Sequence, residues 1–165
     1  MANPTTKVGF RALPPILGAN LYAVDASATV IYKGDVIDPE SDGNVAAAGV
    51  TSAIHLGCTD DYSAGSTAGN IRVYDNPFQV FMCRDDGSAA LAQTNVFNNF
   101  DHVAGTGDAT LLISGHTLKA SDASGTSTAG FRLLGLVAAP DNALLASALW
   151  RVVINEHYLT TTTGV

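Results

Sequence analysis

The clearest pattern of apolar and polar positions lies between residues 71 and 87. Apolar and polar side chains alternate over 71–75, the alternation stops at Asn76-Pro77, and it resumes over 80–85, where Phe81, Cys83 and Asp85 share one face. A period of two residues is that of a β-strand. Asp86-Gly87 has turn chemistry, because glycine accepts a positive φ without steric cost. The segment therefore predicts a strand, a tight turn, a second strand and a second turn.

Similar patterns recur along most of the chain. Further strand candidates follow at roughly 8–15-residue spacing, with Gly, Pro, Asn and Asp between them; they are 21–24, 29–33, 36–37, 44–48, 53–58, 131–137 and 150–159. The nearly continuous apolar run at 131–137 predicts a strand buried on both faces. Short helical turns are expected only at 89–92 and 143–149, and surface loops at 59–70 and 121–129.

These elements predict an all-β fold, either an antiparallel β-barrel or a sandwich, with long loops and at most one or two short helices. The chain has 165 residues, enough for one domain with its own core. Pro14-Pro15 fixes two φ angles and removes two hydrogen-bond donors. We therefore expect residues 1–20 to be an extended N-terminal arm and residues 21–165 to be a single β-rich domain.

Composition supports a helix-poor protein and limits its partners. Charged residues make up only 14% of the chain, and the only Glu and Lys residues, which helix surfaces favour, are Glu40, Glu156, Lys7, Lys33 and Lys119. The net charge is −7 and the eight basic residues are scattered, so no nucleic-acid partner is expected. No apolar run approaches membrane-spanning length, so no membrane partner is expected either. A weakly charged surface fits a subunit of a large assembly, and equally an ordinary soluble β protein.

No residue pattern typical of catalysis or cofactor binding is evident. The adjacent acids at 60–61 and 85–86 point to opposite faces of a strand, so both pairs are interpreted as solvated turn acids. The histidines have no i, i+4 partner and no cysteine stands at zinc-ligand spacing; they are His55, His102, His116 and His157. We therefore expect no enzymatic activity, no cofactor and no metal.

The two cysteines, Cys58 and Cys83, do not make a disulfide framework in a chain of this length. Each continues an apolar face of its strand, which favours buried, reduced thiols. A bridge between them stays open, because the sequence does not place their Cα atoms.

Short phrases along the chain carry a family resemblance. Lys33-Gly34-Asp35-Val36-Ile37, followed by Asp42-Gly43-Asn44-Val45, resembles the opening of small β-rich phage head proteins. Tyr74-Asp75-Asn76-Pro77 with Gln79-Val80-Phe81 and Asp85-Asp86-Gly87, and the ending from Trp150 to Leu159, are similar to capsid decoration (cement) proteins of tailed bacteriophages. The resemblance implies a non-enzymatic β protein, made in the host cytoplasm and placed on the capsid exterior of the virion. Such proteins bridge subunits of the major capsid protein to stabilise the shell, often as homotrimers.

The N-terminal arm is the first candidate for the capsid contact, because an extended, proline-stiffened segment loses little entropy on docking. Its apolar anchors are expected to be Phe10, Leu13, Ile16 and Leu17, unless these four belong to the protein's own core. Phe78 is expected either in the core or in a subunit interface.

Two other functions remain open at this point. One is a carbohydrate-binding or adhesive β-module of a virion, although the loops 59–70 and 121–129 offer only Tyr62 as an aromatic platform and Trp150 is expected in the core. The other is a tail or baseplate structural subunit, which predicts assembly into rings or tubes.

Overall fold

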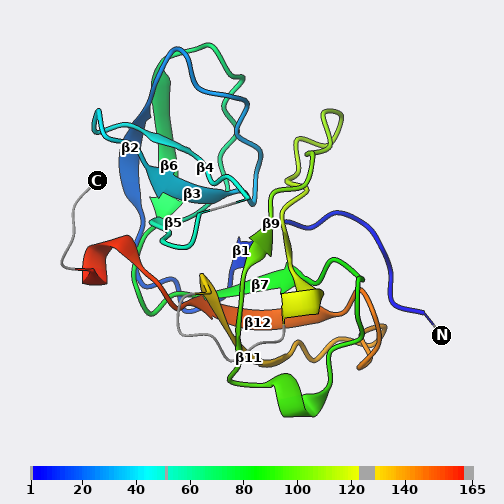
Figure 1. Cartoon of the computed structure of the whole chain (residues 1–165). Helices are drawn as coiled ribbons and strands as arrows, with labels where there is room; N and C mark the ends of the chain where they lie inside the picture. Colours follow the sequence, from blue (N-terminus) through cyan, green and yellow to red (C-terminus); the bar gives the residue numbers. More distant parts are fainter. Residues whose placement is uncertain (1, 51, 123–128, 162–165) are drawn as a thin grey trace.

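The computed structural model of the chain describes residues 2–50, 52–122 and 129–161 (Figure 1). Its strands form two five-stranded antiparallel sheets and a two-stranded ribbon. Three single turns of 3-10 helix complete the regular structure, and the described residues contain no α-helix; the turns are η1 (Gln93–Asn95), η2 (Ala120–Asp122) and η3 (Tyr158–Thr160). The predicted all-β fold is therefore confirmed as two sheets, and neither sheet closes into a barrel.

The first sheet holds the larger core. Its strands in spatial order are β1 (Arg11–Ala12), β7 (Val80–Arg84), β12 (Leu149–Ile154), β11 (Phe131–Leu136) and β8 (Asn99–Phe100). The inward positions of β7 and β12 alternate as the sequence predicts, and Phe81, Trp150 and Val152 are fully buried. The prediction that the 131–137 strand is buried on both faces was wrong. Arg132 of β11 faces solvent, because only one side of this sheet carries the core.

The second sheet curls around a smaller core of its own. Its order is β2 (Asn20–Val24), β6 (Gly69–Tyr74), β5 (Gly57–Thr59), β3 (Val36–Pro39) and β4 (Val45–Ala47). The edge strands β2 and β4 approach each other without pairing. Between them lies an apolar cluster of Val24, Ile31, Ile37, Val45, Leu56, Ile71 and Val73. Figure 1 shows this sheet above the first, with the ribbon of β9 (His102–Val103) and β10 (Thr117–Leu118) beside both.

The segment 71–87 contains the two predicted strands and turns, but it is not a hairpin. β6 belongs to the second sheet and β7 to the first, so residues 75–79 form a crossover between the sheets. Residues 13–19 form a second crossover, from β1 to β2. The turn after β7 has Gly87 at φ +72°, a region where glycine has no steric penalty.

The N-terminal residues lie along the protein's own surface. The side chain of Asn3 is buried and donates to the carbonyl of Ala143 at 3.0 Å, while the Ala143 N–H donates back to Asn3 Oδ1 at 2.9 Å. Further along, the Phe10 N–H donates to the Gly34 carbonyl at 2.8 Å, and β1 pairs with the edge of β7. β2 then begins at Asn20, so the expected arm 1–20 supplies one strand and the first residue of another.

Several local predictions were wrong. The expected strand 29–33 has only isolated bridges at Ile31 and Lys33, and no helical turn forms at 89–92 or 143–149. The last strand ends at Ile154, and the expected loop 121–129 lies largely outside the described residues. The half-buried side-chain amide of Asn142 explains why residues 143–149 are not helical. It bonds Val137 O at 2.9 Å and both backbone groups of Leu149, which fixes a non-helical connection between β11 and β12.

Candidate functional site

An exposed apolar patch stands on the two crossovers between the sheets. Ile16 is 50% exposed, Leu17 is 45% exposed and Phe78 is 77% exposed. We call these three residues the crossover patch. Ile16 and Leu17 come from the 13–19 crossover and Phe78 from the 75–79 crossover, and hydrogen bonds from Leu17 to Gln79 and Asn76 hold these two segments side by side. Large apolar side chains that gather on an exposed surface are typical of a protein interaction site.

The crossover patch is held by the side chains of Gln79 and Asn76. Gln79 is fully buried; its Nε2 donates to the Leu13 carbonyl at 2.8 Å and to the Val80 carbonyl, and its Oε1 accepts the Leu17 N–H at 2.9 Å. Asn76 Oδ1 accepts the Phe78 N–H at 2.9 Å and its Nδ2 donates to the Leu17 carbonyl at 3.5 Å. The backbone beneath the patch is thus fixed before any partner binds, which lowers the entropy lost on docking.

Of the five predicted interface residues, two pack against the protein's own fold and three are exposed. Phe10 is 1% exposed and its ring lies 4.6 Å from the Phe131 ring, so it belongs to the core of the first sheet. Leu13 is half-buried and its backbone bonds β7 and Gln79. Ile16, Leu17 and Phe78 remain exposed.

Asp85 is not a solvated turn acid, so that interpretation was wrong. Its carboxylate is 1% exposed and accepts hydrogen bonds from the N–H groups of Gly87, Ser147 and Ala148, and from the Trp150 indole at 2.9 Å. Asp85 therefore connects the turn after β7 to the start of β12. The signal in the sequence was that Asp85 continues the buried face of Phe81 and Cys83.

All four histidines come together in the fold, although their spacing in the sequence gave no sign of this. The His55 and His102 rings lie 4.9 Å apart, edge to face, and the His102 and His116 rings lie 5.3 Å apart. His157 joins through the backbone: the His55 N–H donates to the Glu156 carbonyl and the Tyr158 N–H donates to the His55 carbonyl, both at 2.9 Å. We call His55, His102, His116 and His157 the histidine cluster. All four are nearly or fully buried.

Burial in the histidine cluster disfavours the charged form of the rings. Desolvation lowers the pKa of His102 to about 3, helped by the neighbouring His55 and His116. Desolvation also lowers the pKa of His116 and of His157, although Asp35 opposes the shift at His116 and Asp75 opposes it at His157. These three imidazoles are therefore neutral at pH 7.

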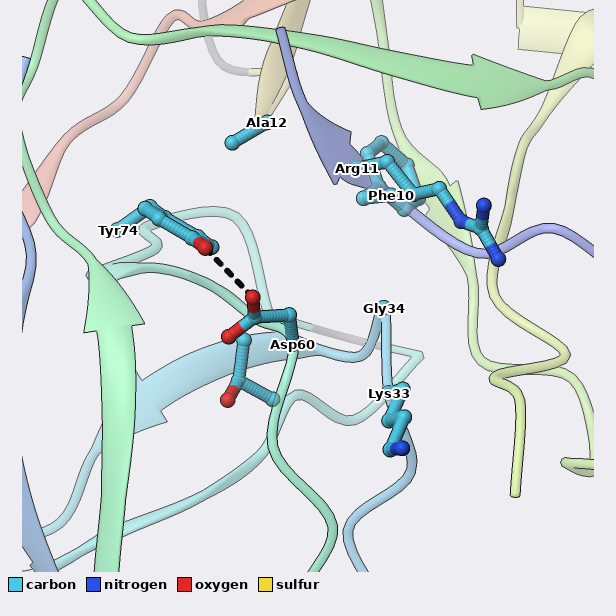
Figure 2. Close-up of a pocket in the computed structure, with 8 residues that line it drawn as sticks. Phe10, Arg11, Ala12, Lys33, Gly34, Asp60 and Tyr74 are labelled. Atoms are coloured by element: carbon cyan, nitrogen blue, oxygen red, sulfur yellow. Dashed lines mark hydrogen bonds between the residues drawn. The ribbon is translucent and has the colours of Figure 1, made fainter. Parts of the chain in front are cut away.

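A pocket of about 280 Å³ opens between β1 and the second sheet (Figure 2). Phe10 and Ala12 line one side, and Tyr74 donates to Asp60 Oδ2 at 2.6 Å on the other. This hydrogen bond, with partial burial, raises the pKa of Tyr74 to about 12, so the phenol keeps its proton at neutral pH and does not act as a base. The described lining contains no histidine or cysteine that could serve as a nucleophile or base.

The two cysteines are free and fully buried, as favoured from the sequence. Within the described ranges, no three His, Cys, Asp or Glu side chains form a group that could hold a metal ion. No helix in the described part of the chain is long and apolar enough to span a membrane. Searches of protein-family models, curated proteins and solved structures found no match to the chain.

Proposed function

We propose that the protein is a structural protein that docks on the outer face of a phage capsid and bridges major capsid subunits. The observation that carries this proposal is the crossover patch, with Phe78 77% exposed on a backbone held by buried Gln79. The resemblance of the turn and strand phrases to decoration proteins gives the class of partner. The sparsely charged surface is of the kind that suits permanent residence in an assembly.

The crossover patch has the properties of a binding hot spot. Hot spots are few, apolar or aromatic, and preorganised, and the contacts around them contribute less. Burying one large apolar side chain such as Phe78 contributes about 2 kcal/mol, which is roughly thirtyfold in affinity. A homotrimer presents three patches, and simultaneous docking then multiplies a modest single-site affinity. A protein that binds only the assembled shell stabilises that shell by mass action.

The crossover patch also predicts how binding responds to salt. Ile16, Leu17 and Phe78 carry no charge, so their burial is not screened by ions. We expect the affinity for the shell to change little between low and moderate salt. A steep loss of affinity with salt would instead indicate that charged groups outside the patch dominate the contact.

The test is co-sedimentation with shells assembled from the major capsid protein of the same phage. Phe78→Ser and Leu17→Ser should each lower the affinity at least tenfold without changing stability, since neither side chain packs in a core. Phe97→Ser is the matched control, because Phe97 is 72% exposed beside β8, at the opposite edge of the first sheet from β1. Absence of wild-type binding, or equal losses for Phe78→Ser and Phe97→Ser, contradicts the proposal.

The oligomeric state gives a second, independent test. Light scattering should report a trimer in solution. Assembly into rings or tubes would favour a tail or baseplate subunit, and a monomer that binds a glycan array would favour the carbohydrate-binding module. Deleting residues 2–15 is a poor test, because Asn3 and Phe10 hold the protein's own fold.

A further inference from the structure

The histidine cluster joins three parts of the fold. His55 lies just before β5 of the second sheet, and His157 lies between β12 and η3. His102 is in β9 and His116 just precedes β10, so the ribbon contributes the other two rings. The cluster therefore sits where the second sheet, the ribbon and the segment after β12 meet.

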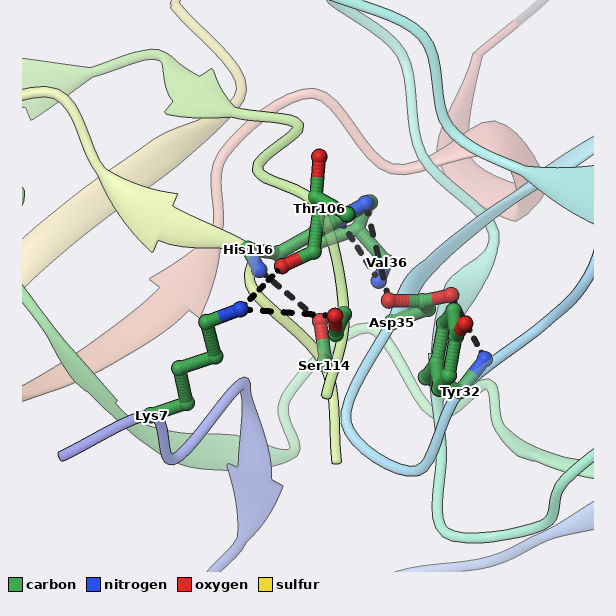
Figure 3. Close-up of polar contacts among 8 residues, drawn as sticks. Lys7, Tyr32, Asp35, Val36, Thr106, Ser114 and His116 are labelled. Atoms are coloured by element: carbon green, nitrogen blue, oxygen red, sulfur yellow. Dashed lines mark hydrogen bonds and ion pairs between the residues drawn. The ribbon is translucent and has the colours of Figure 1, made fainter. Parts of the chain in front are cut away.

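Two of the rings have acidic partners. His55 Nδ1 lies 2.7 Å from Asp38 Oδ1. His116 Nδ1 accepts the Val36 N–H at 3.3 Å, which places the proton on Nε2, and Nε2 faces Asp35 Oδ1 at 3.5 Å (Figure 3). Each of these imidazoles therefore has a carboxylate beside it.

His102 has no such partner. It is 2% exposed, and neither of its ring nitrogens has a hydrogen bond of normal geometry, although the Ala48 backbone lies close to the ring. Its ring neighbours are His55, His116 and Phe131, none of which is an anion. The Nε2 atoms of His55 and His157 are also buried without a partner. A proton added to His102 therefore creates a buried charge with no anion in contact with it, offset only in part by the Ala48 backbone.

The remaining charged groups near the cluster lie at its edges. Asp75 acts on His157 from the end of β6. On the outer side of His116 a pocket of about 250 Å³ is also lined by the charged residues Lys7, Arg84, Asp85 and Asp86. Lys7 donates to the carbonyls of Thr106 and Gly107 (Figure 3), and Asp85 is occupied by its four donors. These groups lie on the His116 and His157 sides of the cluster, and no ion pair among the described residues includes His102.

We propose that the histidine cluster is an acid-sensitive junction, in which protonation of His102 separates the β9–β10 ribbon and the segment after β12 from the second sheet. The first sheet does not depend on the cluster for its β7–β12 ladder, so the junction opens before that ladder does. This inference is independent of what the crossover patch binds.

The direction of the pH effect follows from the difference between the pKa of His102 in the folded protein and the pKa of a histidine in the unfolded chain. In the unfolded chain a histidine takes up a proton below about pH 6.5, while folded His102 resists it until the pH approaches 3. The stabilising difference is therefore complete above about pH 6.5 and is lost as the pH falls through this window. One such histidine raises the opening or unfolding equilibrium constant about 25-fold between pH 7 and pH 5.

The experiment compares urea unfolding at pH 7 and pH 5 for the wild type, His102→Phe and Leu118→Ala. Phenylalanine fills the site without a titratable nitrogen, so His102→Phe should lose most of the 25-fold change. Leu118 pairs with His102 in the ribbon and is fully buried, so Leu118→Ala weakens the same element but should keep the full pH ratio. A wild-type ratio near one, or an unchanged ratio in His102→Phe, overturns the proposal.

Two measurements on the wild type keep the test decisive if His102→Phe does not fold. Nuclear magnetic resonance titration should show His102 still neutral at pH 5, and a His102 that titrates near pH 6.5 overturns the proposal. Hydrogen exchange, corrected for intrinsic rate, should show the His55 and Tyr158 amides losing protection at pH 5 before the β7–β12 ladder. Equal loss of protection in both places contradicts a local junction.

Discussion

Replacing Asp85 with alanine tests whether one buried carboxylate holds the first sheet together. The carboxylate receives four hydrogen bonds, from the N–H groups of Gly87, Ser147 and Ala148 and from the Trp150 indole. Two of its donors come from residues that are fully buried, namely Ala148 and Trp150. No water can replace the lost oxygen at those two donors without entering the core.

The magnitude follows from these donors. Each buried donor left without a partner costs about 1–3 kcal/mol. Asp85 also acts favourably on Arg84, whose pKa is lowered by desolvation and which donates to the carbonyls of Thr6 and Ser147. Two unsatisfied donors and a less compensated cation give an expected destabilisation of about 3–5 kcal/mol for Asp85→Ala.

Urea denaturation at pH 7 measures this loss. Trp150 is the only tryptophan and reports the core of the first sheet, and far-UV circular dichroism provides a signal that does not depend on its indole environment. Asp141→Ala is the matched control: it removes the same group from an exposed residue that accepts none of the hydrogen bonds among the described residues, and it should cost about 0.5 kcal/mol or less. If the two variants lose equal stability, the reasoning from buried donors is wrong.

Two further predictions concern close packing. A Cβ at Gly57 would lie 2.3 Å from the Tyr74 carbonyl oxygen, so Gly57→Ala should lower the free energy of unfolding by about 2 kcal/mol or more. Gly18→Ala is the control: a Cβ there would meet no atom within 4 Å, so the free energy of unfolding should change little in the same urea titration. Cys58 and Cys83 are fully buried, and burial raises the pKa of both thiols. Ellman's reagent should therefore label neither thiol in the native protein and both in urea. Rapid labelling of the native protein would contradict this packing.

The strands were the most predictable part of the fold, because their signal is local. The period-two alternation located β6 and β7, and it also placed Trp150 and Val152 on a buried face. Turn residues showed where a strand ends but not which sheet the chain enters next. Asn76-Pro77 therefore gave no sign that β6 and β7 lie in different sheets, since that choice depends on the packing of the whole chain.

The candidate sites were predictable only where exposure could be guessed from a local segment. Ile16, Leu17 and Phe78 were expected either at an interface or in the core, and all three are exposed. Phe10 instead packs in the core against Phe131, which is more than one hundred residues away in the sequence. The histidine cluster could not be found from spacing. Its members come from separate segments, and only the tertiary fold brings their rings together.

The position of β12 in the first sheet has a consequence for synthesis of the chain. β12 lies between β7 and β11 in the sheet but is synthesised after both. Asn3 is likewise synthesised long before residues 143–146, whose backbone its side chain binds. Until β12 is synthesised, β7 has an unpaired edge beside its apolar face, which is the kind of surface that associates with other nascent chains. The first sheet therefore cannot complete its pairing until β12 has left the ribosome, and its yield in a cell will depend on how well the early strands are shielded.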